Sequence, residues 1–305
     1  SPTRGRWESA IYPLPDVVYD RIHSRSLESR NNVKYAKNRL LQMPYLHYFN
    51  PYYFNKWSVH QTLLNNPLLH KYLPETRELN EKNLADMLPK YRTLFLKPSN
   101  GSLGKGIIKV VTDKGKLKYV VYRGKRIKGQ ADDISDFMKK TKKYRDDRAY
   151  IVQQGLDLIR YRGASFDLRI IFQKNGQGEW QISKKFCRLA PRGSSISNLS
   201  SGGRVENSSK VLKLLFKTEE EITKKNEEIL SLCITVANTL EQESKDIFGE
   251  LGLDIGIERT GRLYLIEVNS KPRKTTESQV SAVIARNTFK RPLAYACYLA
   301  GFNTK

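Results

Sequence analysis

Residues 253 to 269 read LDIGIERTGRLYLIEVN, two apolar runs on either side of a polar turn. Runs of this length around Thr260-Gly261 predict a β-hairpin with strands at Leu253–Glu258 and Leu263–Val268. Strands this apolar belong in the interior of a protein. A polar side chain within them therefore needs a physical reason.

Three oxygen-bearing side chains interrupt these strands, namely Asp254, Glu267 and Asn269. A buried carboxylate costs free energy unless a cation or hydrogen-bond donors offset it. Glu267 and Asn269 are two residues apart, so they point to one face of the strand, and Asp254 can face them from the partner strand. Such oxygen ligands suit Mg²⁺ that bridges ATP phosphates. The alternative is polar alternation at an exposed strand end, but the full set, followed by Lys271 and Arg273, favours a metal site.

The sequence on either side of this hairpin predicts helices mixed with antiparallel hairpins. The longest helix is expected from Thr218 to about Phe248, where Thr218 and Glu221 form a capping box. Further helices are expected at residues 31–42, 56–69 and 134–143, strands at 93–97, 106–111, 118–122, 149–154, 167–173 and 181–188, and turns at Lys114-Gly115 and Asn175-Gly176. This order favours an α+β fold over a doubly wound parallel sheet.

A glycine-rich stretch follows the first of these strands. Lys97 ends the strand, and residues 98–106 read PSNGSLGKG. Backbone N–H groups of such a loop can cradle phosphate oxygens, and the lysine adds a point charge. The spacing matches neither a Walker loop nor a dinucleotide-binding fingerprint. The alternative is an ordinary flexible turn. The lysine at position 97, directly before the loop, favours the phosphate-binding interpretation over it.

Two arginines fall on neighbouring predicted strands. Arg169 and Arg188 can converge on a phosphate or a carboxylate, or else form structural salt bridges. The Ser- and Gly-rich stretch Gly193–Gly203 resembles a lid over a site, with a plain surface loop as the alternative. The four histidines all precede the glycine-rich loop, and we expect them to be structural or peripheral.

The charge of the chain is its most unusual global property. The 305 residues carry a formal net charge of +23, and residues 97–148 hold sixteen Lys or Arg against six Asp or Glu. This excess indicates either attraction to a polyanion or a solvated basic surface. No helix-turn-helix, zinc-finger or RNP-type motif favours nucleic acid as that partner.

Composition restricts the class of protein further. The three cysteines are far apart, which disfavours a disulfide framework and a zinc site and favours a reducing, cytoplasmic compartment. No stretch reaches the roughly 20 apolar residues of a membrane span, and no signal peptide opens the chain, which begins at Ser1.

These motifs, in this order, resemble the ATP-grasp superfamily from about Lys56 to Pro272. The lysine–glycine loop, Asp167-Leu168-Arg169, the Asn-Leu-Ser-x-Gly-Gly sequence at 198–203 and the closing Glu-Val-Asn are similar to those of RimK-type ligases. Together with Trp57-Ser58-Val59-His60 and Leu-Pro-Glu-Thr at 73–76, the whole chain looks most like the YheC/YheD family of endospore coat-associated proteins.

The resemblance implies two α+β lobes that clamp ATP, preceded by a small N-terminal lobe. We expect the N-terminal lobe at residues 1–55 and the ATP-grasp domain at 56–305. Within that domain the resemblance implies a glycine-loop lobe at about 90–155 and a catalytic lobe at about 156–290.

The resemblance also implies roles for individual residues. Mg²⁺ or Mn²⁺ would be bound by Asp254, Glu267 and Asn269. Arg169, Arg188 and Asn198 would stabilise the transferring phosphoryl group and an acyl phosphate. The implied nucleotide contacts are Lys56, Lys97, Ser102, Gly104, Gly106, Gln153, Gln154, Leu156 and Asp157. Gln153, Gln154 and Leu156 would form the hinge that contacts adenine, and Gln154 stands there where many members have an acidic residue.

The implied function is an ATP-dependent carbon–nitrogen ligase that releases ADP and phosphate. Its partners would be a carboxylate donor and an amine acceptor, with the basic charge favouring a peptide or an acidic polymer. Two alternatives stay open: a nucleotide-binding spore-coat protein without turnover, and a small-molecule kinase of ATP-grasp type. The resemblance implies a spore-coat association for this otherwise cytoplasmic chain.

Overall fold

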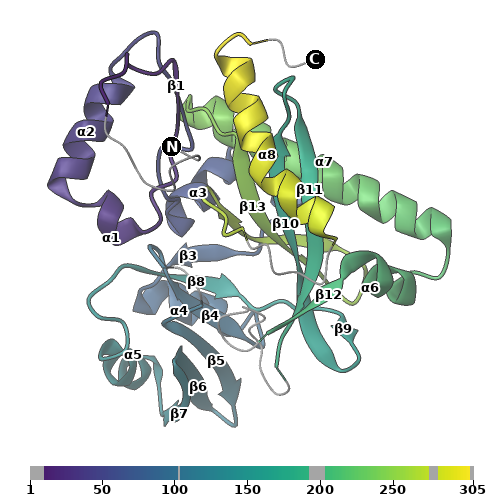
Figure 1. Cartoon of the computed structure of the whole chain (residues 1–305). Helices are drawn as coiled ribbons and strands as arrows, with labels where there is room; N and C mark the ends of the chain where they lie inside the picture. The colour runs from purple at the N-terminus through teal and green to yellow at the C-terminus, as the bar shows by residue number, and fades with distance from the viewer. Residues whose placement is uncertain (1–9, 102–103, 192–202, 275–280, 303–305) are drawn as a thin grey trace.

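The computed structural model describes residues 10–101, 104–191, 203–274 and 281–302. Two six-stranded antiparallel sheets form two lobes, with helices packed on their outer faces (Figure 1). The predicted α+β class is therefore confirmed. Within the described residues, no helix is long and apolar enough to cross a membrane.

The smaller lobe is built on the sheet β3-β8-β4-β5-β6-β7. Helices α4 and α5 cover one face, where Leu84, Met87 and Phe137 pack on Leu96 and Val110. Strand alternation leaves Lys97 and Gln153 on the opposite face. The bounds are β3 Thr76–Glu78, α4 Glu81–Met87, β4 Leu94–Pro98, β5 Ile107–Asp113, β6 Lys116–Arg123, β7 Lys125–Ala131, α5 Ile134–Lys142 and β8 Tyr150–Gln154.

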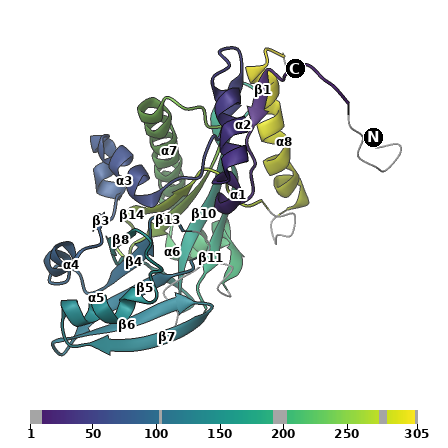
Figure 2. The same cartoon turned by 90° about the vertical axis from the view of Figure 1, so that its left-hand side faces the viewer.

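The larger lobe is built on the sheet β12-β11-β10-β13-β14, with β9 paired to β10. Helices α7 and α8 lie on opposite sides of this sheet (Figure 2). The bounds are β9 Arg160–Tyr161, β10 Ala164–Lys174, β11 Trp180–Leu189, β12 Arg204–Asn207, α6 Ser208–Leu215, α7 Glu219–Ser244, β13 Glu250–Ile257, β14 Leu263–Asn269 and α8 Ala282–Leu299.

The N-terminal segment packs against the larger lobe. It begins with a short parallel pair of strands, β1 Val17–Tyr19 and β2 His47–Phe49. Along the chain, α1 Arg25–Glu28 and α2 Asn31–Leu41 connect these two strands. Phe49 is fully buried, with its ring against Tyr19 and against Tyr295 of α8. After it, α3 Lys56–Leu64 and the 3₁₀ helix η1 Pro67–Tyr72 lead into the smaller lobe.

Most predicted elements are found within a few residues of their expected bounds. The capping box of α7 is confirmed, but the helix ends at Ser244 because Lys245 takes a left-handed conformation with φ of 58°. The turn after β10 is also longer than the predicted Asn175-Gly176 pair. Asn175 N–H donates to Glu179, and the positive φ falls at Gly178.

Cross-strand register decides which side chains share a face of the larger sheet. Glu267 pairs with Asp254, Asp254 with Arg169, and Arg169 with Phe186. Leu168 and Ile170, which flank Arg169 along β10, point into the core under α7. The polar row therefore lies on the face opposite α7.

The basic stretch forms the outer strands and helix of the smaller lobe. Several of its cations make exposed ion pairs with acids of the same stretch, including Lys116 with Asp132 and Arg123 with Asp146. Such exposed pairs add little stability.

Candidate functional site

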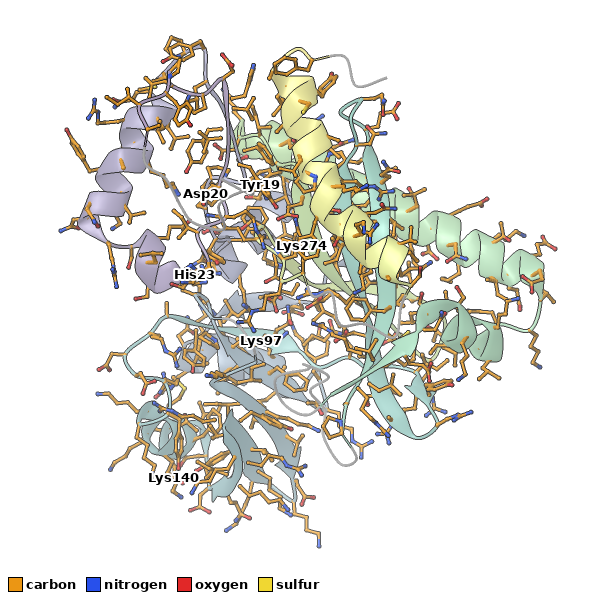
Figure 3. The ribbon with its side chains drawn as sticks, in the orientation of Figure 1. Tyr19, Asp20, His23, Lys97, Lys140 and Lys274 are labelled. Atoms are coloured by element: carbon orange, nitrogen blue, oxygen red, sulfur yellow. The ribbon has the colours of Figure 1, made fainter. Side chains whose placement is uncertain are left out.

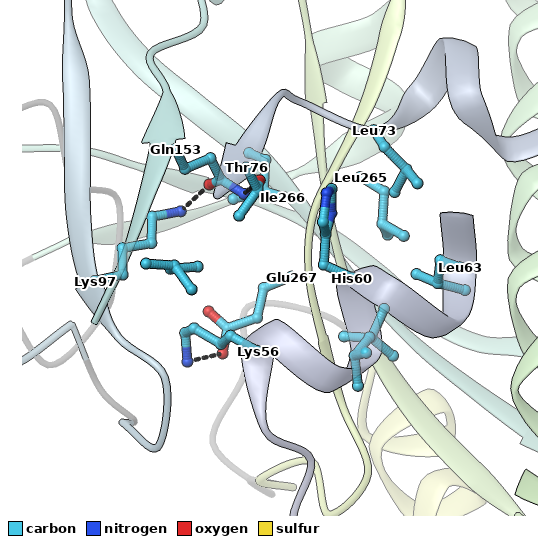
Figure 4. Close-up of a pocket in the computed structure, with 13 residues that line it drawn as sticks. Lys56, His60, Leu63, Leu73, Thr76, Lys97, Gln153, Leu265, Ile266 and Glu267 are labelled. Atoms are coloured by element: carbon cyan, nitrogen blue, oxygen red, sulfur yellow. Dashed lines mark hydrogen bonds and ion pairs between the residues drawn. The ribbon is translucent and has the colours of Figure 1, made fainter. Parts of the chain in front are cut away.

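A pocket opens where the two lobes meet α3, with an empty volume of about 450 Å³ including the solvent at its mouth. Figure 4 shows its lining side chains converging from both lobes. They are Lys56, Val59, His60, Leu63, Leu73, Thr76, Lys97, Ile151, Gln153, Leu265, Ile266, Glu267 and Val268.

The pocket has an apolar wall and a charged end. Leu63, Leu73 and Leu265 belong to the wall, and His60 lies beside them with its ring stacked on Trp57. Burial lowers the pKa of His60 to about 4, so the ring is neutral at physiological pH. Such a wall suits a flat, weakly polar ring system.

Lys97 lies at the charged end and is held by a neutral partner. Its Nζ donates to Gln153 Oε1 at 2.5 Å, and Gln153 Nε2 donates to Thr76 Oγ1 at 3.0 Å. Burial lowers the pKa of Lys97 to about 8, although the charge of Glu267 opposes the shift. Among the described residues no carboxylate is in ion-pair contact with this buried ammonium, which is therefore well suited to receive an anion.

Lys56 joins the glycine-rich loop to the closing hairpin. It begins α3, whose N-cap Asn55 accepts from Trp57 N–H. Its Nζ donates to Gly101 O at 2.8 Å and lies 3.1 Å from Glu267 Oε1. One cation therefore links the loop that could hold phosphates to a candidate metal ligand.

A buried ionic network adjoins this end of the pocket. Arg188 Nε donates to Asp167 Oδ1 at 2.7 Å, and its Nη2 lies 2.8 Å from Asp254 Oδ2. Arg169 Nη1 contacts the other Asp254 oxygen at 2.5 Å. Burial would raise the pKa of Asp254, but the charges of Arg169 and Arg188 outweigh it and hold that pKa below its usual value.

Asn269, on the same face and two residues after Glu267, contacts the polar row. With its amide nitrogen toward Glu267 Oε1 (3.2 Å), its oxygen accepts from Arg169 Nη1 (3.2 Å). Asp254, Glu267 and Asn269 thus adjoin one another, as the hairpin pattern predicted. Within the described ranges, no group of three or more His, Cys, Asp or Glu side chains could hold a metal ion.

Several predicted nucleotide contacts lie outside the pocket lining. The side chain of Gln154 accepts from Glu75 N–H, and Asp157 is exposed. Leu156, Gly104 and Gly106 are also absent from the lining. The two glycines have positive φ, and Gly106 O accepts from the Tyr150 hydroxyl. The predicted residues Ser102 and Asn198 and nearly all of the predicted lid at 193–203 lie outside the described residues.

Sequence reasoning overlooked His60, Leu73 and Thr76 as pocket residues. A signal existed for His60, since it is four residues after Lys56 and three before Leu63 and therefore shares a helix face with both. Leu73 and Thr76 follow a turn, so no periodic pattern could have indicated them.

Comparison with known proteins connects this geometry to a family. The family model for YheC/D-like ATP-grasp proteins matches residues 45–299. Endospore coat-associated protein YheD of Bacillus subtilis (strain 168) is 30% identical over 298 residues, covering 96% of this chain and 65% of YheD. Endospore coat-associated protein YheC of the same strain is 25% identical over 300 residues, covering 96% and 80%. The resemblance inferred from the motifs is confirmed.

A solved structure supports the same fold. The ATP-grasp ligase PsnB, complexed with a minimal precursor, matches with a TM-score of 0.51 at 11% identity, covering 90% of this chain and 79% of that one. At this identity the likeness concerns the fold alone. The two-lobed architecture is the ATP-grasp fold.

Proposed function

The chain belongs to the YheC/D-like ATP-grasp family, and on this premise we propose that it is a magnesium-ATP-dependent ligase that joins a carboxylate to an amine. One observation carries the proposal. Lys56, Lys97 and Glu267 face one pocket, which adjoins Arg169 and Arg188 on the same sheet face. Cations for phosphates and cations for a second anion thus lie side by side.

The proposed reaction has two steps. A substrate carboxylate oxygen bonds to the γ-phosphorus of ATP while the bond to the β–γ bridging oxygen breaks, giving an acyl phosphate and ADP. The amine nitrogen then bonds to the acyl carbon, phosphate leaves with the C–O electron pair, and the nitrogen loses a proton. Such chemistry depends on positioning and charge stabilisation and requires no protein nucleophile.

The residues would divide this work by position. The apolar wall would receive the adenine ring, and Lys56 and Lys97 would bind phosphate oxygens as point charges. Arg169 and Arg188 would hold the carboxylate and stabilise charge on the transferring group. Ion pairs with Asp254 and Asp167 orient both guanidinium groups in advance.

The metal site fits the proposal in its donor chemistry. Glu267, Asn269 and Asp254 supply the hard oxygens that Mg²⁺ prefers, and they adjoin one another. Both Asp254 oxygens contact arginines, so Glu267 and Asn269 are the more available ligands. Bound Mg²⁺ would neutralise phosphate charge.

Hydroxylamine trapping tests this function. An active ligase incubated with Mg-ATP, candidate carboxylates and hydroxylamine yields a hydroxamate, because hydroxylamine attacks the activated acyl carbon of an acyl phosphate, whereas a phosphorylated hydroxyl has no such carbon. We expect Glu267→Gln to abolish hydroxamate formation and Glu258→Gln, at the far end of the same hairpin, to retain it.

Nucleotide binding supplies the second readout. At a ligand concentration one hundred times Kd, the wild type should gain about 2.7 kcal/mol of stability. ADP formation without hydroxamate would favour a kinase. A protein that neither binds nucleotide nor forms hydroxamate would contradict the ligase proposal.

The names of the relatives support a location. YheD and YheC are named endospore coat-associated proteins, and we propose the same association for this chain. Recovery of a tagged copy in the coat fraction of purified spores would support it. Recovery only in the mother-cell supernatant would contradict it.

A further inference from the structure

One face of the larger sheet, here called the reactive face after the proposed function, carries Arg169, Arg188, Asp254 and Glu267. This face continues beyond Arg169 to Lys184. Ile171, two residues along β10 from Arg169, pairs with Lys184 on β11. Ile171 also pairs with Gly252, and Gly252 pairs with Asn269. Directly paired residues share a face, so Lys184 lies on the same face as the candidate reactive residues. Two residues along a strand place this row about 7 Å from the Arg169 row.

Lys184 is a buried cation with no anionic partner among the residues that the structure describes. The residue is 6% exposed, and its Nζ lies over the Phe186 ring at 5.2 Å from the centroid. Within the described part of the chain its ammonium makes no hydrogen bond and no ion pair. Burial alone lowers the pKa of Lys184.

The adjacent Lys185 provides a contrast within one strand. It pairs with Ile170 and points to the opposite face, where its Nζ donates to Asn226 of α7. Lys185 thus has the kind of partner that a structural lysine needs, and Lys184 does not.

A second cation reaches the same end of the face from α8. Arg291 Nη1 donates to Ser183 Oγ at 2.6 Å. Ser183 is the extra residue of a β-bulge beside Lys184, at the register shift between Ile171 and Phe172. Burial is the sole cause of the lowered pKa of Arg291. Lys184 and Arg291 therefore lie near each other at this end of the face, and neither makes an ion pair with a described carboxylate.

An isolated buried charge costs desolvation free energy, and such groups cluster at functional sites, where a ligand offsets that cost. The row spacing of about 7 Å is of the same order as the separation of the two acid groups in a short dicarboxylate. Phe186, which pairs with Arg169 and lies under the Lys184 ammonium, offers an apolar surface for the carbon chain that joins the two acid groups.

We propose that Lys184, with Arg291 beside it, binds a second carboxylate of the acyl donor, so that the donor is a dicarboxylate or an acidic amino-acid unit. The inference rests on the proposed ligase function for the role of the bound molecule. One carboxylate would lie at Arg169 and Arg188 and react, and the other would lie at Lys184 and set specificity.

Calorimetric titration without nucleotide tests the subsite. Glutarate is the probe, and butyrate, with one carboxylate fewer, is its control. The wild type should bind glutarate more tightly than butyrate. Lys184→Met should weaken glutarate binding by about 10- to 100-fold and leave butyrate within about two-fold, because a charge-assisted hydrogen bond is lost. Lys184→Arg should restore most of the difference.

Lys185→Met is the matched control, since it removes a half-buried cation from the opposite face. It should leave glutarate binding unchanged and lower the Tm. Lys184→Met should raise the Tm, because it replaces an unpaired buried charge with an apolar side chain of similar shape.

The proposal is overturned if the wild type shows no preference for glutarate, or if Lys185→Met weakens glutarate binding as much as Lys184→Met. A lower Tm in Lys184→Met would indicate a structural lysine and also count against it. Because the titration requires no ATP, Lys184-dependent glutarate binding would survive a failed hydroxamate assay. A positive hydroxamate assay with no Lys184 effect would refute the subsite alone.

Discussion

Two buried ionic clusters lie on one side of the larger lobe, and they differ in how completely their cations are paired. The first, here the anchor cluster, joins the N-terminal segment to β13 and to the chain after β14. The second is the reactive face. Figure 3 shows Tyr19, Asp20 and Lys274 close to one another, whereas Lys97 lies separately at the junction of the lobes. The anchor cluster comprises Tyr19, Asp20, Arg21, Glu28, Lys37, Glu250, Lys271 and Lys274.

Every cation of the anchor cluster has a carboxylate partner. Lys271 lies 2.7 Å from both Asp20 and Glu28, and Lys274 lies 2.6 Å from Glu250. The fully buried Glu250 also accepts from Arg21 at 2.7 Å. Burial would raise the pKa of Asp20, but its bonds to Lys271 and to the backbone keep that pKa lowered.

The reactive face pairs its charges incompletely. Arg169 and Arg188 share Asp254, but among the described residues Lys184 only overlies a ring. In the adjoining pocket Lys97, on β4 of the smaller lobe, is hydrogen-bonded to a neutral amide and makes no ion pair with a described carboxylate. Complete pairing locks segments together, whereas an incompletely paired buried cation remains ready for an anionic ligand. The presence of a carboxylate partner, more than the degree of burial, distinguishes the cations of the anchor cluster from those of the candidate site.

The largest expected effect comes from breaking the anchor cluster. Glu250→Ala leaves Lys274 buried without its carboxylate and should cost about 3–5 kcal/mol of unfolding free energy. Urea denaturation measures this. Asp132→Ala, in an exposed pair with Lys116, is the control and should cost less than about 1 kcal/mol. Equal losses would show that pairing in the anchor cluster adds nothing.

A smaller effect is expected from titrating Lys97 in the pocket beside the reactive face. Lys97 must be protonated to bind phosphate, and its pKa in the free protein is about 8. ATP affinity should therefore be constant below pH 8 and fall by up to about ten-fold per pH unit above it. Fluorescent-nucleotide titration from neutral to alkaline pH measures this. In Lys97→Arg, whose side chain stays charged, affinity should not vary, and a wild-type profile without a break near 8 would contradict the assignment.

Folding stability should show the opposite trend. Because folding lowers the pKa of Lys97, its protonated form opposes folding below pH 8, and this cost is relieved as pH rises toward the unfolded value near 10.5. Relative to Lys97→Met, the wild type should gain unfolding free energy over that interval.

The smallest expected effect comes from removing one hydroxyl that donates to the anchor cluster. Tyr48 donates to Asp20 at 2.9 Å inside the anchor cluster. Tyr48→Phe should cost about 1 kcal/mol, because Asp20 keeps its other donors. ATP affinity should stay within about two-fold of wild type. A larger change in affinity would mean that the two clusters are energetically coupled.

The closing hairpin shows how much local pattern can predict. Its two strands, its turn and the shared face of Glu267 and Asn269 follow from apolar runs and a period of two. The capping box of α7 was predicted in the same way, since Thr218 and Glu221 are only three residues apart. The α+β class followed from the order of such patterns, and the family from the resemblance of the ordered motifs to known proteins.

Helix α8 shows where pattern fails. It contains Pro292, and it exposes apolar side chains such as Val283 and Leu293, so its periodicity is weak. It is a helix because its other face packs on β10 and β11, where Thr288 O accepts from Gln173. That support comes from residues more than one hundred positions away.

By itself the sequence determined the α+β class and the residue types of the candidate site, because these depend on short-range periodicity and composition. The family came from the resemblance of the ordered motifs to known proteins. Only the tertiary structure decided which charges are paired. Glu250 meets Arg21 across 229 residues, and Lys184 differs from Lys185 through register and a bulge at Ser183. Coulomb energy and desolvation depend on distance in space, and strand register, which no local pattern encodes, sets those distances.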